Sequence, residues 1–248
     1  MIDASLLLIL PLALAAFFLK GIATFGAGVV LVPLGALLIG TKEVVLLIAI
    51  LDLISNAFLY RPRKKHFRDP FLIAMTVFMV IGVLTGALIL KHLQASQFDI
   101  MFAMILIPLG IWMMVTTLFN IPVQQRGQAP TASSKLDRSI SLVSGCMGGV
   151  LGLTGPVLAW YLSRRYSKQV FRDMMIPLLL VSACARILLY SATGVFDSNI
   201  FPVVLVSLPG LVIGIWLGNR LFFRVQQKWF DRIVGGLITV SGIKLLSR

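Results

Sequence analysis

Long apolar runs, separated by short basic segments, constrain this chain more than any other feature. About 20 helical residues cross a bilayer, so most of these runs have the length of a single span. Only 12% of the residues are charged, against about 25% in soluble domains. The sequence therefore predicts an all-α, polytopic membrane bundle, and it excludes a soluble enzyme and a disordered chain. The apolar stretches cover roughly residues 4–40, 44–60, 70–90, 98–119, 139–163, 173–191, 199–219 and 231–246.

Two of these stretches have glycine-rich centres, where a continuous helix is unfavourable. Residues 4–40 are too long for one span and contain a glycine cluster at 21–28, and residues 139–163 contain another at 145–155 that is followed by Pro156. Glycine in a helix interior costs about 1 kcal/mol and proline about 3 kcal/mol. A loosened backbone inside a membrane is tolerated only where protein or a cavity shields it. We therefore expect each of the two stretches to be a broken helix or hairpin.

The basic segments predict the topology of the chain. The positive-inside rule places four Lys- and Arg-rich loops in the cytoplasm, namely residues 61–69, 126–138, 164–173 and 220–232. Eight simple crossings would put the two loops that flank 139–163 on opposite faces, although both are basic. If both glycine-rich stretches are hairpins, the chain is a hairpin plus three spans, twice, and the second half is inverted. Eight simple spans, with one loop that breaks the charge rule, remain the alternative.

Residue matches between the two halves indicate an internal duplication. We expect a first membrane repeat at residues 1–120, a cytoplasmic linker at 121–138 and a second repeat at 139–248. Glycines four residues apart let a neighbouring helix approach closely, so the matched glycine pairs predict helix packing rather than substrate contact. The matches at an offset of 127 are Gly21 with Gly148, Gly28 with Gly155 and Ser55 with Ser182; those at 132 are Gly82 with Gly214, Gly86 with Gly218, Phe98 with Phe230, Asp99 with Asp231 and Gly110 with Gly242.

The order of these glycine motifs resembles that of the TauE/SafE family of sulfite and organosulfur-anion exporters. The resemblance covers almost the whole chain. It departs from the family pattern at Ala27, which interrupts the first glycine run, and at Leu153-Thr154 in the second. The motifs that carry the resemblance are Gly21-x4-Gly26-Ala27-Gly28-x4-Pro33, Gly82-x3-Gly86, Gly148-x3-Gly152-x2-Gly155-Pro156 and Gly210-x3-Gly214-x3-Gly218-Asn219-Arg220.

This resemblance implies a secondary transporter of the inner membrane that exports a small sulfur-containing anion by alternating access. Inverted repeats are a recurrent transporter plan, with the binding site near the midplane where broken helices meet. Two other functions remain open at this point, a channel-like anion pore and a membrane subunit that anchors a partner without transporting anything. The identity of the anion and of any coupling ion is not fixed by the sequence.

Backbone N–H groups at a broken helix can hold a small oxyanion without any catalytic group, because they lie at the positive end of the helix dipole. The alternative is that these glycines only permit sharp turns. Polar residues near the two breaks could add donors. The predicted substrate-binding residues are Thr24, Gly26, Ala27, Gly28, Ser55, Asn56, Thr154, Gly155, Ser182 and Arg186.

Three ionisable residues, Lys20, Asp52 and Arg186, lie inside the apolar runs. Each is costly in a membrane unless it is paired or lies in a wet cavity, so each is a functional candidate. The planar guanidinium of Arg186 suits a pair of sulfonate or sulfite oxygens, although it could also snorkel to the interface or serve in an ion pair. Asp52 could carry a coupling proton or form a salt bridge with Lys20 or Arg186.

Nothing in the sequence indicates catalysis or a cofactor. His-Glu-x-x-His, Gly-x-Ser-x-Gly and P-loop motifs are absent, and the two cysteines show no metal or redox spacing. We therefore expect no enzyme activity, no metal and no cofactor. The expected partners are a small anion and the lipid bilayer, with no nucleic acid, and the chain could also form a homodimer.

Overall fold

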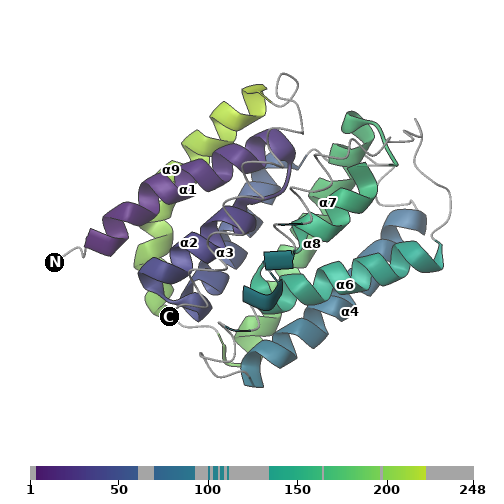
Figure 1. The fold of residues 1–248 in the computed structure, drawn as a ribbon, viewed down its shortest axis with the longest axis horizontal. Coiled ribbons are helices and arrows are strands. Elements are labelled where there is room, and N and C mark those ends of the chain that lie inside the picture. Colours follow the sequence, from purple (N-terminus) through teal and green to yellow (C-terminus); the bar gives the residue numbers. More distant parts are fainter. Residues whose placement is uncertain are drawn as a thin grey trace. The chain divides into compact units, whose positions relative to one another are not determined.

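The described part of the chain is almost entirely helical (Figure 1). The computed structural model describes residues 4–60, 70–92, parts of 100–111, 134–163, 165–195 and 198–221. Basic segment 61–69, most of 126–138 and 220–232, and the last apolar stretch, 231–246, lie outside these ranges. The described helices are α1 (Ala4–Ala23), α2 (Ala27–Ile39), α3 (Thr41–Leu59), α4 (Pro70–His92), α6 (Lys135–Leu151), α7 (Gly155–Ser163), α8 (Lys168–Ala192), the short 3-10 helix η2 (Ser198–Ile200) and α9 (Phe201–Leu221).

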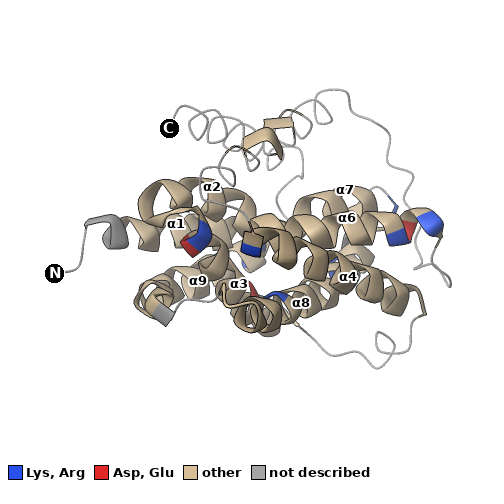
Figure 2. Ribbon diagram, turned by 90° about the horizontal axis from the view of Figure 1, so that it is seen from below, with Lys and Arg blue, Asp and Glu red and all other residues tan. Residues whose placement is uncertain are grey.

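Three of these helices are long and apolar enough to cross a membrane: α4, α9 and residues 169–192 of α8. Their exposed positions carry large apolar side chains, such as Val77, Leu188 and Leu205, which are 50%, 71% and 66% exposed. Figure 2 shows that charged residues occupy few positions on the described helices. Apolar faces of this kind are suited to lipid rather than to water. The prediction of a helical membrane bundle is therefore confirmed.

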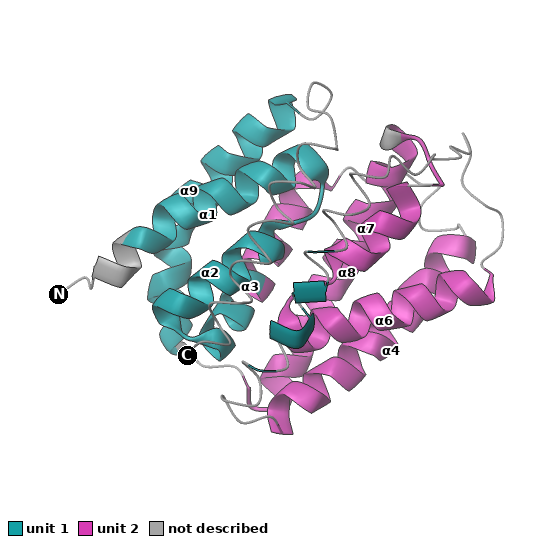
Figure 3. Ribbon diagram, viewed as in Figure 1, with its two compact units in different colours: residues 1–48, 93–122, 197–248 teal, residues 49–92, 123–196 magenta. Residues whose placement is uncertain are grey.

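The chain forms two compact units (Figure 3). Unit 1 comprises residues 1–48, 93–122 and 197–248, and unit 2 comprises residues 49–92 and 123–196. Each unit thus combines helices from both predicted repeats: α1 and α2 with α9 in unit 1, and α4 with α6, α7 and α8 in unit 2. The repeat boundaries themselves stay a prediction.

Both long apolar stretches are broken at their glycine clusters. In unit 1, three residues separate α1, which ends at Ala23, from α2, which begins at Ala27. In unit 2, three residues separate α6, which ends at Leu151, from α7, which begins at Gly155. The helices before the breaks, α1 and α6, end 128 residues apart, and the helices after the breaks, α2 and α7, begin 128 residues apart. The two breaks therefore occupy equivalent positions.

In unit 2, α4 packs closely against α6 because small residues face each other. A Cβ atom at Gly86 would overlap the backbone carbonyl of Cys146 and would lie 2.9 Å from the Cα of Gly149 and from the N of Val150. No side chain larger than hydrogen fits there unless the two backbones separate.

Unit 1 repeats this contact between α9 and α1. A Cβ atom at Gly218 would overlap the carbonyl of Phe18 and would lie 2.9 Å from the Cα of Gly21 and 3.1 Å from the N of Ile22. The glycine ladders therefore serve helix packing, as their spacing predicts.

The α4–α6 contact and the α9–α1 contact match residue by residue. The numbering difference between equivalent residues is one value for α4 and α9 and another for α1 and α6. Gly218 and Gly86 are 132 residues apart, as the sequence alignment has them, but Gly21 in unit 1 is equivalent to Gly149 and not to Gly148. The offset for the broken stretches is thus 128 rather than 127. The sequence could not separate the two values, because Gly148 and Gly149 are adjacent and only the helix face distinguishes them.

Candidate functional site

A buried ion pair joins α3 and α8 within unit 2. The Nη2 of Arg186 donates a hydrogen bond of 2.8 Å to the Oδ2 of Asp52. Arg186 is only 1% exposed and Asp52 only 9%. A charge of either sign is costly in such surroundings unless it has a partner. Arg186 is thus a partner of Asp52, as one of the pairings that the sequence leaves open has it.

The ion pair uses only part of the donor capacity of Arg186. Its Nε and Nη1 are buried and have no hydrogen-bond partner among the described residues. A guanidinium group carries five N–H donors and cannot lose its charge in a protein. Buried donors that lack a partner indicate a water, an ion or a ligand that completes the site. The Nε and Nη1 groups of Arg186 can therefore donate hydrogen bonds to such a partner.

Asn56 adds a second unsatisfied group one helical turn from Asp52. The side chain is fully buried, and neither its amide nitrogen nor its amide oxygen has a partner in the described structure. Residues i and i+4 share a helix face, so this amide lies beside the Asp52 end of the ion pair. Ser55 differs, because its hydroxyl donates to the carbonyl of Asp52 at 3.0 Å and so serves its own helix.

Thr154 and Ser182 lie together in unit 2, with their hydroxyl oxygens 2.9 Å apart. Ser182 precedes Arg186 by one turn on α8, which brings this pair to the same face of the helix. The carbonyl of Thr154 accepts a further hydrogen bond from the hydroxyl of Ser144 on α6. Tyr190, one turn beyond Arg186, donates to the carbonyl of Gly149 at 2.7 Å. Hydrogen bonds from α6 and α8 therefore fix the second break.

The first break, in unit 1, has a strained residue. Thr24 has φ 75°, and it is the one non-glycine residue of the described chain with positive φ. The equivalent residue of the second break is Gly152, with φ 73°. A β-branched residue in this region costs about 1–3 kcal/mol, whereas glycine adopts it freely. The Oγ1 of Thr24 is also buried without a hydrogen-bond partner in the described residues.

Two other groups adjoin this break in unit 1. Lys20, one turn before Thr24, is 1% exposed, and its Nζ lies 5.7 Å from the centre of the Phe17 ring. Gly26, with φ 104°, is the N-cap of α2 and provides no side-chain hydrogen bond to the helix. The first N–H groups of a helix have no partner within it, so those at Ala27 and Gly28 lie at the positive end of α2.

The predicted residues thus fall into two groups, each within one unit. Unit 2 brings together residues of three helices and of the second break, and unit 1 places the rest around the first break. The group in unit 2 comprises Asp52, Ser55, Asn56, Thr154, Gly155, Ser182 and Arg186, and the group in unit 1 comprises Lys20, Thr24, Gly26, Ala27 and Gly28.

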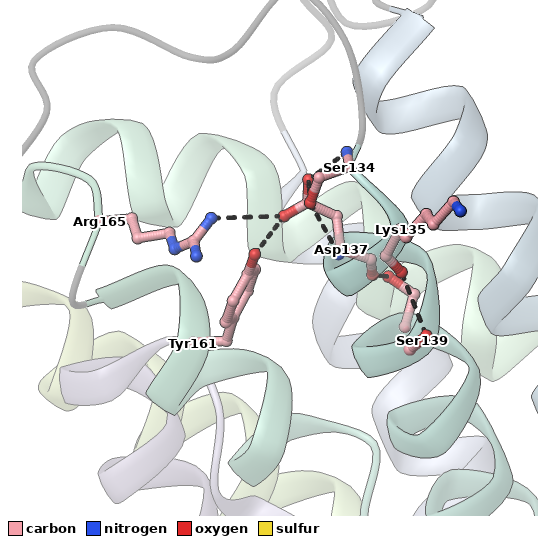
Figure 4. A network of polar contacts seen from close by, with 7 residues as sticks. Ser134, Lys135, Asp137, Ser139, Tyr161 and Arg165 are labelled. Atoms are coloured by element: carbon pink, nitrogen blue, oxygen red, sulfur yellow. Dashed lines mark hydrogen bonds and ion pairs between the residues drawn. The ribbon is translucent and has the colours of Figure 1, made fainter.

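A polar network between the start of α6 and the end of α7 was not predicted from the sequence (Figure 4). The Oδ2 of Asp137 accepts hydrogen bonds from the N–H and the hydroxyl of Ser134, which caps α6. Its Oδ1 accepts a hydrogen bond from the hydroxyl of Tyr161 on α7 and lies 3.7 Å from Nη1 of Arg165. The sequence does contain a signal for the first part of this network, because Ser134-x-x-Asp137 before an apolar run has the spacing of a capping box.

This network determines the ionisation of Asp137. Burial raises the pKa of the carboxyl group, but the hydrogen bonds from Tyr161 and Ser134 favour the carboxylate, as does the guanidinium of Arg165. The second set of effects is larger in sum, so the pKa of Asp137 lies below its ordinary value. Its stabilising contribution is therefore present above the unfolded-state pKa of about 4 and is lost as the pH falls through the lower folded-state pKa.

Tyr161→Phe should lower the stability of unit 2 at neutral pH. The change removes a hydrogen bond to a carboxylate, which is worth roughly 1.5–3 kcal/mol. Because the pKa of Asp137 then rises, the gap between wild type and variant should shrink below about pH 4. Thermal unfolding of purified protein at pH 7 and at pH 4 measures both effects. Ser139→Ala is the matched control, because that exposed hydroxyl bonds only to the carbonyl of Lys135; equal unfolding temperatures for both variants at pH 7 would contradict the account.

Comparison with protein families connects this geometry to transport. The family model described as sulfite exporter TauE/SafE matches residues 9–245, nearly the whole chain. Comparison with curated proteins and with solved structures gave no match. The family is a transporter family, which agrees with the apolar helices and with the buried charged site. The chain therefore belongs to the sulfite exporter TauE/SafE family of membrane proteins.

Proposed function

We propose that this protein exports a small sulfur-containing oxyanion, such as sulfite or an organosulfonate, across the inner membrane by alternating access. The observation that carries the proposal is the buried Arg186, which has two unpaired nitrogens beside one that is bound to Asp52. Planar guanidinium groups bind oxyanions through two parallel hydrogen bonds. Family membership supplies the class of substrate.

The other polar groups near Arg186 suit the same ligand. The Asn56 amide can donate one hydrogen bond and accept another, and the hydroxyls of Thr154 and Ser182 lie one turn away along α8. The amides at the start of α7 in the same unit are further anion donors in our proposal. Asp52 balances the charge of Arg186 when no anion is bound, and it is the residue that would carry a proton if transport is coupled to protons.

Export of an anion does not require such coupling. A negative-inside membrane potential favours the outward movement of one negative charge by about 2.3 kcal/mol at 100 mV. We place the basic segments 61–69, 126–138, 164–173 and 220–232 on the cytoplasmic side, where they attract the anion and contact anionic lipids. The proposal involves no metal, cofactor or nucleic acid, and it is compatible with a homodimer.

Flux measurements in proteoliposomes test this function. Vesicles loaded with ³⁵S-sulfite, thiosulfate, an organosulfonate or a carboxylate should release the sulfur anions at a rate that saturates with concentration. Unlabelled anion outside should accelerate release by counter-exchange, which a carrier performs and a pore does not. Flux that rises linearly without counter-exchange would favour the channel. Absence of flux, together with a stable copurifying protein, would favour the anchor subunit.

A further inference from the structure

The first residues of the two breaks have similar backbone geometry, but the side chains of the two breaks differ in their hydrogen bonds. In the first, the N–H of Thr24 bonds to the carbonyl of Lys20 at 2.7 Å, and in the second, the N–H of Gly152 bonds to the carbonyl of Gly148 at 3.0 Å. The first residue of each break adopts nearly the same positive φ. Glycine is thus sufficient to build this turn, and the second break uses it.

Thr24 makes the first break less stable than a glycine would. It brings a strained backbone and a buried hydroxyl that has no partner among the described residues. Both penalties disappear if the side chain is removed. Strain of this kind is kept where the surrounding structure imposes it for a function, so the hydroxyl of Thr24 requires a partner that is not part of the described chain.

The second break shows what such a turn looks like when its polar groups are used internally. The hydroxyl of Thr154 bonds to Ser182, and its carbonyl accepts from Ser144. The hydroxyl and the carbonyl of Thr154 therefore both have partners within the chain, unlike the hydroxyl of Thr24. The two breaks are equivalent in position but differ in whether the hydroxyl has a partner among the described residues.

We infer that the first break, residues 24–26, is an anion-binding site in which the Thr24 hydroxyl donates a hydrogen bond to the ligand. The buried cation of Lys20 lies one turn before Thr24, and the positive end of the 13-residue helix α2 begins directly after the break. A cation, a hydroxyl donor and helix N–H groups together suit a small oxyanion. The inference rests on the proposed function, and it adds the hydroxyl of Thr24, for which the second break has Gly152 at the equivalent position.

Thr24→Gly tests the inference, because it should raise stability and lower affinity at once. Without anion, the unfolding temperature should rise by roughly 2–6 °C as the strain is relieved. The dissociation constant for ³⁵S-sulfite, measured by equilibrium binding to purified protein, should increase roughly ten- to a hundredfold. Thr24→Ser keeps the hydroxyl and should bind within a few-fold of wild type.

Thr193→Ala is the matched control, since that hydroxyl bonds to the carbonyl of Leu189 in its own helix. It should change neither affinity nor the response to anion. If wild-type protein binds sulfite and Thr24→Gly binds it equally well, this inference is wrong while the proposed function stands. If Thr24→Gly unfolds at a lower temperature than wild type, the hydroxyl has a structural role and the inference is also wrong. Wild-type protein that binds none of the tested sulfur anions contradicts the proposed function itself.

Discussion

Replacing Arg186 by glutamine and Asp52 by asparagine together should give a folded protein that no longer transports the anion. The double change keeps the size and polarity of both side chains but removes both charges from the interior of unit 2. The anion then loses the charge-assisted donors of Arg186, and we expect the flux of ³⁵S-sulfite in proteoliposomes to fall at least about a hundredfold.

The double substitution is needed because Arg186→Gln alone removes the ion-pair partner of a buried carboxylate, Asp52. Breaking a buried pair in this way costs about 3–5 kcal/mol, so a loss of transport could then reflect loss of the fold. Asp52→Asn alone breaks the same pair but keeps the charge of Arg186, so it is compared with the double variant in protein that stays folded. It frees the Nη2 of Arg186 from its internal carboxylate, so anion affinity should stay equal or increase. The account is wrong if the double variant transports at the wild-type rate, or if Asp52→Asn abolishes binding in a folded protein.

Gly86→Val should prevent unit 2 from folding. The new side chain would overlap the Cys146 carbonyl, and relief would require α4 and α6 to separate along their whole contact. Overpacking usually costs about 1–3 kcal/mol, because flexible side chains nearby move and absorb part of the strain. Here the neighbouring atoms belong to the backbone of α6, which cannot move in this way. We expect a loss above about 4 kcal/mol, which few single substitutions reach.

Size-exclusion chromatography of detergent-solubilised protein, followed by thermal unfolding, measures this effect. Gly218→Val in unit 1 should behave in the same way, because it meets the carbonyl of Phe18. Leu88→Val is the control on α4, since Leu88 is 45% exposed on an apolar face. An unfolding temperature for Gly86→Val within about 2 °C of wild type would show that the helices do not approach as closely as described.

The sequence predicts much of this fold because its signals are local. Apolar length predicts the spans, and glycine clusters predict the breaks near Gly26 and Gly152, since both features follow from the backbone itself. The spacing of Gly82 and Gly86 predicts a close helix contact for the same reason. The sequence does not predict which helix makes this contact, because a row of glycines can pack against any helix surface that is equally flat.

The site was less predictable because it depends on distant pairs. Arg186 and Asp52 are 134 residues apart, and Lys20 was an equally acceptable partner for Asp52 on charge alone. The positive φ of Thr24 could not be anticipated, since threonine is disfavoured in that region. The bond from Tyr161 to Asp137 was missed because an apolar run does not reveal which tyrosine hydroxyl lies near the helix cap.

Anomalous diffraction with selenite, a heavier analogue of sulfite, tests the central claim most directly. Crystals of wild-type protein grown with selenite should show a selenium peak whose oxygens lie within hydrogen-bond distance of the Nε and Nη1 of Arg186. The peak should be absent from crystals of the Asp52→Asn, Arg186→Gln double variant. A structure in which another side chain accepts hydrogen bonds from these two nitrogens, with no selenium beside Arg186, would contradict the account.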